Sequence, residues 1–406
     1  MASPPIIATP PSSPSGSASR LTSLDAFRGF TMLLMASEIA GLPHALLRDY
    51  AGNGLAFFVA DMLEHREWVG VTPWDLIQPS FMFMVGVALP FSVASRRERG
   101  HAFGRLFAHA LLRSLLLILL GIFLRSQGRP QTYFTFEDVL TQIGLGYPFL
   151  FLLAWARPRW QAVAAVAILV GYWAAFALYP LPPPGFDWTS VGVPADWPYH
   201  LSGFMAHWDK NTNLAQPADV WFLNLFPRES PFRFNGGGYL TLNFVPSLAT
   251  MIFGLLAGGL VKAAPRVPAT AWRLAAWGAA GIVVGVLLHV AGVCPLVKRI
   301  WTPSWAVFSA GWATLFLAAW YAAIDLRGWT RAAFPFLVVG MNSIAMYVLV
   351  HVGDRYTMNA LQIHLGTAPF AWLGPTFVPV LTGAAALAIF WVVLWWMYRR
   401  RLFLRI

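Results

Sequence analysis

LEHREWVGVTPWDLIQPSFMF, residues 63–83, takes the chain from a polar segment into an apolar one. Four ionisable residues, EHRE, lie near its start, and beyond residue 75 almost every side chain is apolar. Thr72 suits the N-cap of a helix, Pro73 suits the first helical position, and Asp75 has the spacing of a capping box. The apolar run that follows can supply the roughly 20 residues that a membrane-spanning helix needs. We therefore predict that a transmembrane helix begins here.

The composition of the whole chain predicts the same class of protein. Of its 406 residues, 58% are hydrophobic and 11% are charged, whereas soluble domains carry about 25% charged residues. The mean hydropathy is +0.59, and the 20 Trp and 31 Phe suit membrane interfaces. We expect an all-α polytopic membrane protein embedded in a lipid bilayer.

About ten apolar segments have the length of transmembrane helices. They are predicted at Phe27–Leu47, Pro73–Ala94, Phe103–Leu124, Leu140–Ala156, Trp160–Pro180, Phe244–Val261, Trp272–Val290, Ser304–Ile324, Phe334–Val352 and Phe377–Trp396. Residues 1–20, rich in Pro and Ser, predict a disordered tail that is not a signal peptide. Residues 21–406 would then form one membrane domain. Its longest connection, at about 181–243, is rich in Trp and Phe, which favours an ordered segment.

The basic residues predict how these helices are oriented. With the N-terminus in the cytoplasm, most of them fall in short inside loops and fewer in the longer outside loops, as the positive-inside rule requires. Both termini are then cytoplasmic, and the 181–243 loop and His65 lie outside. The net charge of +11 is explained by these loops and does not indicate a nucleic-acid partner. The predominance of Arg over Lys indicates a bacterial cytoplasmic (inner) membrane.

Two polar residues within the stretch 63–83 are candidates for a functional site. Asp75 can be explained as a helix cap, or it can belong to a functional site. His65 precedes the cap and lies in a loop, where Glu64 and Glu67 could orient one ring nitrogen. No second histidine lies at ligand spacing and Cys294 is the only cysteine, so no metal site is expected.

The first span contains two further candidates. Arg28 lies three residues after Asp25, on one helix face, so it can be a snorkelling arginine with a carboxylate partner, or a guanidinium placed for a phosphate. Glu38 lies deep in the same segment, where a carboxylate is costly unless it is paired or faces a polar cavity. We treat both as candidate site residues.

Later segments add candidates of the same kind. Lys298 and Arg299 lie at the predicted outer end of the eighth helix, against the positive-inside bias, which favours an anionic partner or an internal carboxylate. Asn342 and Ser343 lie inside the ninth span, where they can join helices by hydrogen bonds or line a tunnel.

Four segments together resemble a known family. They are LTSLDAFRGFTMLLM (21–35), HREWVGVTPWDLIQPSFMFMVGVALPFSV (65–93), PLVKRIWTPSWAVFSAGWA (295–313) and FLVVGMNSIAMYVL (336–349). In order and spacing they resemble the membrane domain of the heparan-α-glucosaminide N-acetyltransferase family, including its bacterial members. The resemblance covers nearly all of residues 21–398.

The resemblance implies transmembrane acetyl transfer from cytoplasmic acetyl-CoA to an amino sugar or glycan on the far side. The active histidine of the family belongs to an H-x-x-W-x-G pattern that His65 to Gly70 match. His65 could carry the acetyl group or act as general base, with Asp75 beside it. Arg28, Asn342 and Ser343 would bind the CoA donor. Glu38, Trp68, Lys298 and Trp301 would contact the acceptor.

Some segments depart from the family pattern. Glu38 occupies a position near a usual asparagine, Thr141–Gly144 lacks a usual arginine, and Asn235–Tyr239 replaces an acidic loop. We expect no large extracytoplasmic domain before the first span. The identity of the acceptor is therefore not carried over, and the oligomeric state, homodimer included, is left open. A transporter or flippase without group transfer, and a membrane scaffold, are the alternative functions.

Overall fold

The computed structural model describes residues 21–404, and all the regular elements in that range are helical. The tail predicted at 1–20 lies outside the described residues. The α-helices are α1 (Thr22–Ala36), α2 (Leu42–Tyr50), α3 (Gly54–Met62), α4 (Ile77–Glu98), α5 (Phe103–Arg125), α6 (Val139–Leu153), α7 (Pro158–Ala177), α8 (Ala215–Leu223), α9 (Phe244–Ala263), α10 (Pro268–Val290), α11 (Pro303–Trp320), α12 (Phe334–Gly340), α13 (Ser343–Leu365) and α14 (Val378–Arg399).

The all-α polytopic fold is confirmed, with slightly fewer candidate spans than the roughly ten predicted. Within residues 21–404, seven helices are long and apolar enough to cross a membrane, or nine if two bent pairs are each one span. The first pair, Thr22–Ala40 with Leu42–Tyr50, bends by 43° at Gly41, whose φ of 61° suits glycine. The second, α12 with α13, bends by 79°. The remaining predicted span became α6, which at 15 residues is short for a straight crossing.

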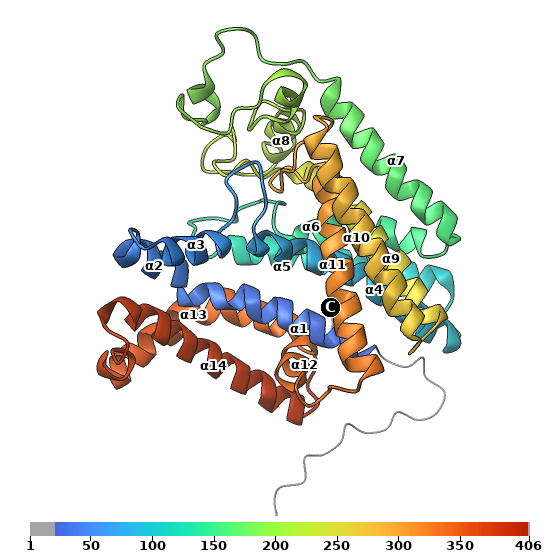
Figure 1. Ribbon diagram of the computed structural model, residues 1–406, viewed down its shortest axis with the longest axis vertical. Helices are drawn as coiled ribbons and strands as arrows, with labels where there is room; N and C mark the ends of the chain where they lie inside the picture. The colour runs from blue at the N-terminus through green and yellow to red at the C-terminus, as the bar shows by residue number, and fades with distance from the viewer. Residues whose placement is uncertain (1–20, 405–406) are drawn as a thin grey trace, which may run out of the picture.

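Glycines allow the helices at the centre to approach closely. A Cβ on Gly254 of α9 would collide with the carbonyl oxygen of Phe83 in α4, and one on Gly86 would collide with that of Met251. Small residues of this kind are how membrane helices pack without a hydrophobic driving force. In Figure 1, α1 and α12–α14 form one group of helices, α7 and α9–α11 another, and α4, α5 and α6 lie between them.

Residues 178–243, called here the cap region, cover one end of the helices (Figure 1). The cap region contains α8 and three short 3-10 helices, Trp188–Val191, Gly203–Trp208 and Thr241–Asn243. Its buried Trp197 and Trp208 pack with Trp68 in a hydrophobic cluster. Such burial of large aromatic rings anchors the long connection on the membrane domain.

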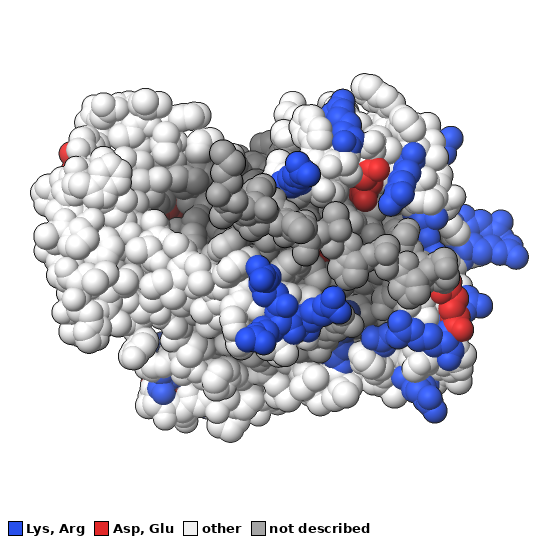
Figure 2. All heavy atoms as spheres, turned by 90° about the horizontal axis from the view of Figure 1, so that it is seen from below, with Lys and Arg blue, Asp and Glu red and all other residues white. Residues whose placement is uncertain are grey.

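Surface chemistry agrees with a membrane environment. Only 17% of the most apolar window of α10 is buried inside the protein, against 67% for α9, so α10 presents its apolar side chains outward. Figure 2 shows Lys and Arg gathered toward one side of the visible face, with large uncharged areas elsewhere. The chain is thus an integral membrane protein, and the cytoplasmic placement of its termini stays a prediction.

Candidate functional site

Two loops distant in sequence are paired beside the starts of α4 and α11. Val69 and Val297 form an antiparallel bridge, and the Gly70 N–H donates to the Leu296 carbonyl over 3.0 Å. Because the pairing aligns the residues on both sides of the bridge, the segment before α4 lies against the segment before α11. His65 and Lys298, which are 233 residues apart, are thereby brought into contact.

His65, Asp75 and Lys298 form a compact polar cluster, called here the triad. His65 Nδ1 lies 2.9 Å from Asp75 Oδ1, and Lys298 Nζ lies 3.2 Å from the same oxygen. Lys298 Nζ is also 2.9 Å from His65 Nδ1. Asp75 and Lys298 are buried, whereas 38% of the His65 side chain is exposed. The imidazole is therefore the accessible member of the triad.

The second carboxylate oxygen of Asp75 forms the predicted helix cap. Oδ2 accepts hydrogen bonds from the Thr72 N–H at 3.1 Å, from the Thr72 hydroxyl at 3.2 Å and from the Arg66 N–H at 3.3 Å. The capping box with Thr72 is confirmed. The two explanations of Asp75 are therefore compatible, because one oxygen caps the helix while the other contacts His65 and Lys298.

The contacts of Nδ1 decide which ring nitrogen of His65 is available, because Asp75 and Lys298 both approach it. An ionised carboxylate only accepts hydrogen bonds, so in the tautomer with Nδ1–H donating to Asp75 the Nε2 atom keeps its lone pair; this tautomer requires the Lys298 ammonium to donate to Asp75 and not to Nδ1. Burial lowers the pKa of Lys298, and the adjacent Asp75 carboxylate opposes that fall. With two of its members buried, the triad holds the imidazole in one orientation, with Nε2 able to take a proton or an acyl group.

His65 lines a cavity of about 380 Å³, called here the His65 cavity. Its lining is rich in polar and ionisable side chains. They are Glu38, His65, Gln78, Arg125, Glu137, Asp138, Tyr239, Lys298, Tyr347 and His351. Burial raises the pKa of Glu137 to about 7, although Arg125 acts in the opposite direction. This cavity can therefore hold a small polar molecule against several hydrogen-bonding groups.

A second cavity, of about 330 Å³, is lined by three arginines and is called here the Arg28 cavity. Among the described residues around it, Arg28, Arg96 and Arg113 are the charged ones, and none is acidic. Arg113 lies in the middle of α5, where Nη1 donates to the Tyr147 hydroxyl over 3.1 Å. Guanidinium groups around one space suit an anionic ligand, above all a phosphate.

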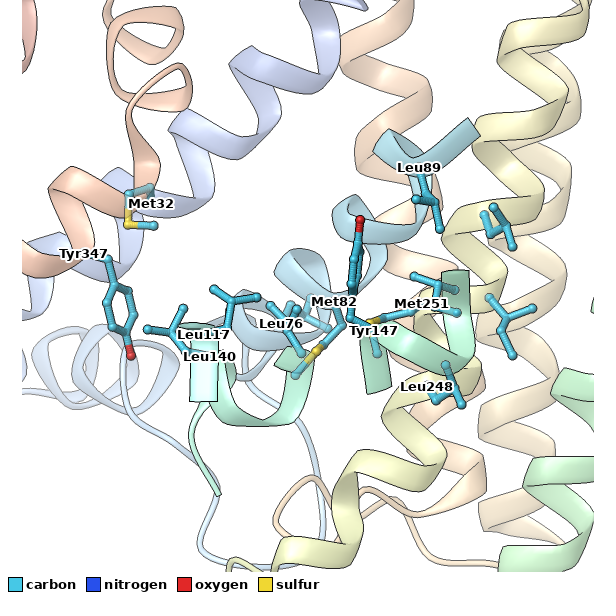
Figure 3. Packing of buried hydrophobic residues seen from close by; sticks show 14 of the residues in the cluster. Met32, Leu76, Met82, Leu89, Leu117, Leu140, Tyr147, Leu248, Met251 and Tyr347 are labelled. Atoms are coloured by element: carbon cyan, nitrogen blue, oxygen red, sulfur yellow. The ribbon is translucent and has the colours of Figure 1, made fainter. Parts of the chain in front are cut away.

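The rest of the Arg28 cavity is apolar. Met32, Leu117, Leu140 and Tyr347, from four different helices, form part of its wall. Figure 3 shows these four side chains close to one another, with the Tyr347 ring beside Leu117 and Leu140. The cavity thus combines anion-binding groups with an apolar surface, as a ligand with both a charged and an uncharged part requires.

The two cavities are adjacent. Phe81 of α4, Val139 of α6 and Tyr347 of α13 line both of them. The Tyr347 ring stacks on His351, with centroids 4.1 Å apart. These three side chains therefore separate the arginine-lined space from the space that contains His65.

The structure brings most of the predicted site residues to these cavities. His65, Lys298 and Glu38 line the His65 cavity, and Asp75 is hydrogen-bonded to His65. Arg28, which also contacts Asp25 at 3.4 Å, lines the Arg28 cavity together with Ser343. These six residues come from four stretches of the chain, at 28–38, 65–75, 298 and 343.

Besides Asp75, which contacts His65 from behind, three predicted residues do not line either cavity. Trp68 and Trp301 are each 1% exposed, and their indole N–H groups donate to the Trp208 carbonyl and the Thr250 hydroxyl. The side chain of buried Asn342 binds the chain near its C-terminus, donating to the Leu402 carbonyl and accepting from the Leu404 N–H. The contacts of these three side chains are structural.

Several cavity residues were absent from the sequence-based prediction. Arg113 carried a usable signal, because an arginine in the middle of an apolar span is costly and points to function. Glu137 and Asp138 carried no signal, because their loop reaches the cavity only through the folded arrangement. Glu67, which was expected to orient the His65 ring, accepts a hydrogen bond from the Trp197 indole at 2.9 Å. The carboxylate that contacts His65 is that of Asp75. Within residues 21–404, no three His, Cys, Asp or Glu side chains are grouped to hold a metal ion.

Comparison with known proteins identifies distant relatives. No protein-family model matches the chain. It is 25% identical to heparan-α-glucosaminide N-acetyltransferase of Mus musculus over 84% of this chain and 54% of the relative. The corresponding protein of Homo sapiens is 24% identical over 95% of this chain and 60% of the relative. The chain spans about half to three-fifths of the length of these curated relatives. Over most of its own length it is a distant homologue of heparan-α-glucosaminide N-acetyltransferase.

Proposed function

We propose that this membrane protein is an acetyl-CoA-dependent N- or O-acyltransferase centred on His65. It would take an acetyl group from cytoplasmic acetyl-CoA and deliver it to an amino sugar or glycan across a bacterial cytoplasmic membrane. The observation that carries the proposal is the adjacency of the two cavities, one lined by arginines and the other containing His65. The distant similarity to an acetyltransferase supports the same reaction class.

The Arg28 cavity is the proposed donor site. Coenzyme A carries phosphates at one end and a long, weakly polar arm that ends in the thioester. Arg28, Arg96 and Arg113 would bind the phosphates, because guanidinium groups match phosphate oxygens in charge and geometry. The apolar wall and Ser343 would hold the arm. Asn342 would not touch CoA, and would support the donor site by binding the backbone of Leu402 and Leu404.

The acetyl group would reach His65 past Phe81, Val139 and Tyr347. Two steps are compatible with the triad. In the first, Nε2 attacks the thioester carbonyl, the carbon–sulfur bond breaks and CoA leaves as a thiolate. In the second, Nε2 takes the proton of the acceptor while the acceptor itself attacks the thioester carbonyl, the carbon–sulfur bond breaks and CoA leaves as a thiolate. In both steps Asp75 holds the ring through Nδ1–H.

The acceptor would occupy the His65 cavity, with Glu38 and Lys298 among its contacts. Trp68 and Trp301 would act by supporting the loops that carry His65 and Lys298. A transporter or flippase is the second candidate, because a pair of adjacent cavities also suits a solute path. Group transfer distinguishes the two functions, since transport leaves acetyl-CoA unchanged.

Purified protein in lipid nanodiscs, supplied with acetyl-CoA and a panel of amino sugars, tests the proposal. Wild type should consume acetyl-CoA and acetylate an acceptor, and His65→Ala should reduce the rate by about 100-fold or more, as expected for loss of a general base or nucleophile. His364→Ala, which removes an exposed histidine at the end of α13, is the matched control and should leave the rate unchanged. If wild type neither binds CoA nor turns it over, the acyltransferase function is rejected and the transporter function is favoured.

A further inference from the structure

Glu137 is a carboxylate in the His65 cavity to which the preceding reaction assigns no task. It lies in the loop between α5 and α6 and faces the same space as His65 and Lys298. We propose, on the basis of the acyltransferase function above, that Glu137 receives the proton that the acceptor loses, which leaves His65 free to carry the acetyl group.

The other carboxylates in or beside this space are less suited to accept the proton of the acceptor. Asp75 contacts His65 and Lys298 with one oxygen and caps a helix with the other. Asp138 caps α6, accepting from the Leu140 and Thr141 N–H groups and the Thr141 hydroxyl. Glu38 is exposed at the edge of the cavity, where water competes for its carboxylate. Glu137 is the half-buried carboxylate of this cavity that retains capacity to accept a proton.

The loop 235–239 holds Glu137 in place. The Asn235 side-chain amide donates to Glu137 Oε2, and the Asn235 Oδ1 in turn accepts from the Gly237 N–H at 2.8 Å. Arg299 donates to the Gly237 carbonyl over 2.7 Å and to the Arg66 carbonyl over 3.2 Å. Arg299 therefore connects the loop 235–239, which holds Glu137, to the loop that carries His65. Within residues 21–404, Oε2 alone of the two Glu137 oxygens receives a hydrogen bond, so Oε1 is available to a ligand.

The charges around Glu137 come from four segments. Arg125 at the end of α5 and Arg228 after α8 favour the ionised form, whereas Asp138 and Asp219 of α8 oppose it. Burial is the largest effect and raises the pKa of Glu137 to about 7. A general base works best when its pKa lies near the operating pH. Glu137 meets that condition at neutral pH.

The step balances with the groups present. The acceptor nitrogen or oxygen attacks the acetyl carbonyl carbon on His65 Nε2, forming the new carbon–nitrogen or carbon–oxygen bond. The bond between the acetyl carbon and Nε2 breaks, and its electron pair returns to the imidazole. The proton of the attacking group passes to Glu137, which later releases it to water.

The pH dependence of acetyl transfer tests this assignment. Because only ionised Glu137 accepts a proton, kcat/KM for the acceptor in wild type should fall as the pH decreases through about 7. Glu137→Gln should lower transfer by about 100-fold or more and abolish this fall at low pH, called here the acid limb of the profile. Two amine acceptors of different basicity should show the same limb, because it belongs to the protein. Glu229→Gln removes an exposed carboxylate and should leave rate and profile unchanged.

A second variant keeps the test decisive if Glu137→Gln does not fold. Arg125→Gln removes a cation that favours ionised Glu137, so the acid limb should move to higher pH. The assignment is overturned if Glu137→Gln keeps the limb or stays within a few-fold of wild type, or if Arg125→Gln leaves the limb in place. Failure of the acyltransferase function itself is recognised separately, because wild type then transfers no acetyl group.

Discussion

Asp75→Asn is the substitution whose outcome follows most directly from the triad. Asparagine preserves the shape of the side chain and can still accept from the Thr72 N–H, so the helix cap is largely retained. The lost charge, however, leaves the Lys298 ammonium, only 4% exposed, without its carboxylate. Removing one partner of a buried ion pair costs about 3–5 kcal/mol.

The same change should impair catalysis. The amide group of the substituted side chain can donate to Nδ1 of His65 and thereby move the imidazole proton to Nε2, where the lone pair is needed. A wrong tautomer of this kind in a hydrogen-bonded catalytic histidine costs up to about 10⁴-fold in kcat. We expect Asp75→Asn to lose stability and at least about 100-fold in acetyl transfer.

Thermal unfolding in detergent and acetyl transfer, measured on the single and double variants, test both effects. Lys298→Met should also destabilise, because it leaves Asp75 buried without the ammonium. The double variant Asp75→Asn/Lys298→Met should be more stable than the sum of the single effects predicts, by about 0.5–3 kcal/mol of coupling, and should remain inactive. Strictly additive stability changes, or an active Asp75→Asn, would refute the reasoning.

Three further outcomes are expected. Arg113→Gln should weaken CoA binding by about tenfold or more, since it removes a charged hydrogen-bond donor from the Arg28 cavity; titration calorimetry with CoA measures this, and unchanged affinity would contradict it. Tyr347→Ala should raise turnover of butyryl-CoA relative to acetyl-CoA, because the side chain narrows the junction of the two cavities; an unaltered ratio would remove Tyr347 from acyl selection. Gly254→Ala should destabilise by about 1–3 kcal/mol through collision with α4, whereas Gly259→Ala in the same helix meets nothing within 4 Å and should not destabilise; equal unfolding midpoints would argue against the close contact.

The local features of this protein follow from its sequence, because they depend on neighbouring residues. Thr72, Pro73 and Asp75 suffice to begin a helix, and a run of apolar side chains suffices to predict a membrane span. The bends at Gly41 and between α12 and α13 did not follow in this way. Each predicted segment was long enough to be one straight helix, whereas the first is bent by 43° and the second by 79°.

The candidate site was only partly predictable. Lys298 stood out because its charge opposes the orientation bias, and His65 stood out through a family pattern. Trp68 and Trp301 were predicted to contact the acceptor, but large aromatic side chains also serve the core, and only the structure shows both buried.

What tertiary structure decided is which distant groups share a space. The sequence determined a helical membrane protein with polar residues at the mouths of its helices. The antiparallel pairing of Val69 with Val297 then placed Lys298 against His65 and Asp75. The loop before α6 placed Glu137 in the same cavity. Hydrogen bonds and ion pairs act over a few ångströms in space, so proximity along the chain does not reveal them, and folding alone assembles the site.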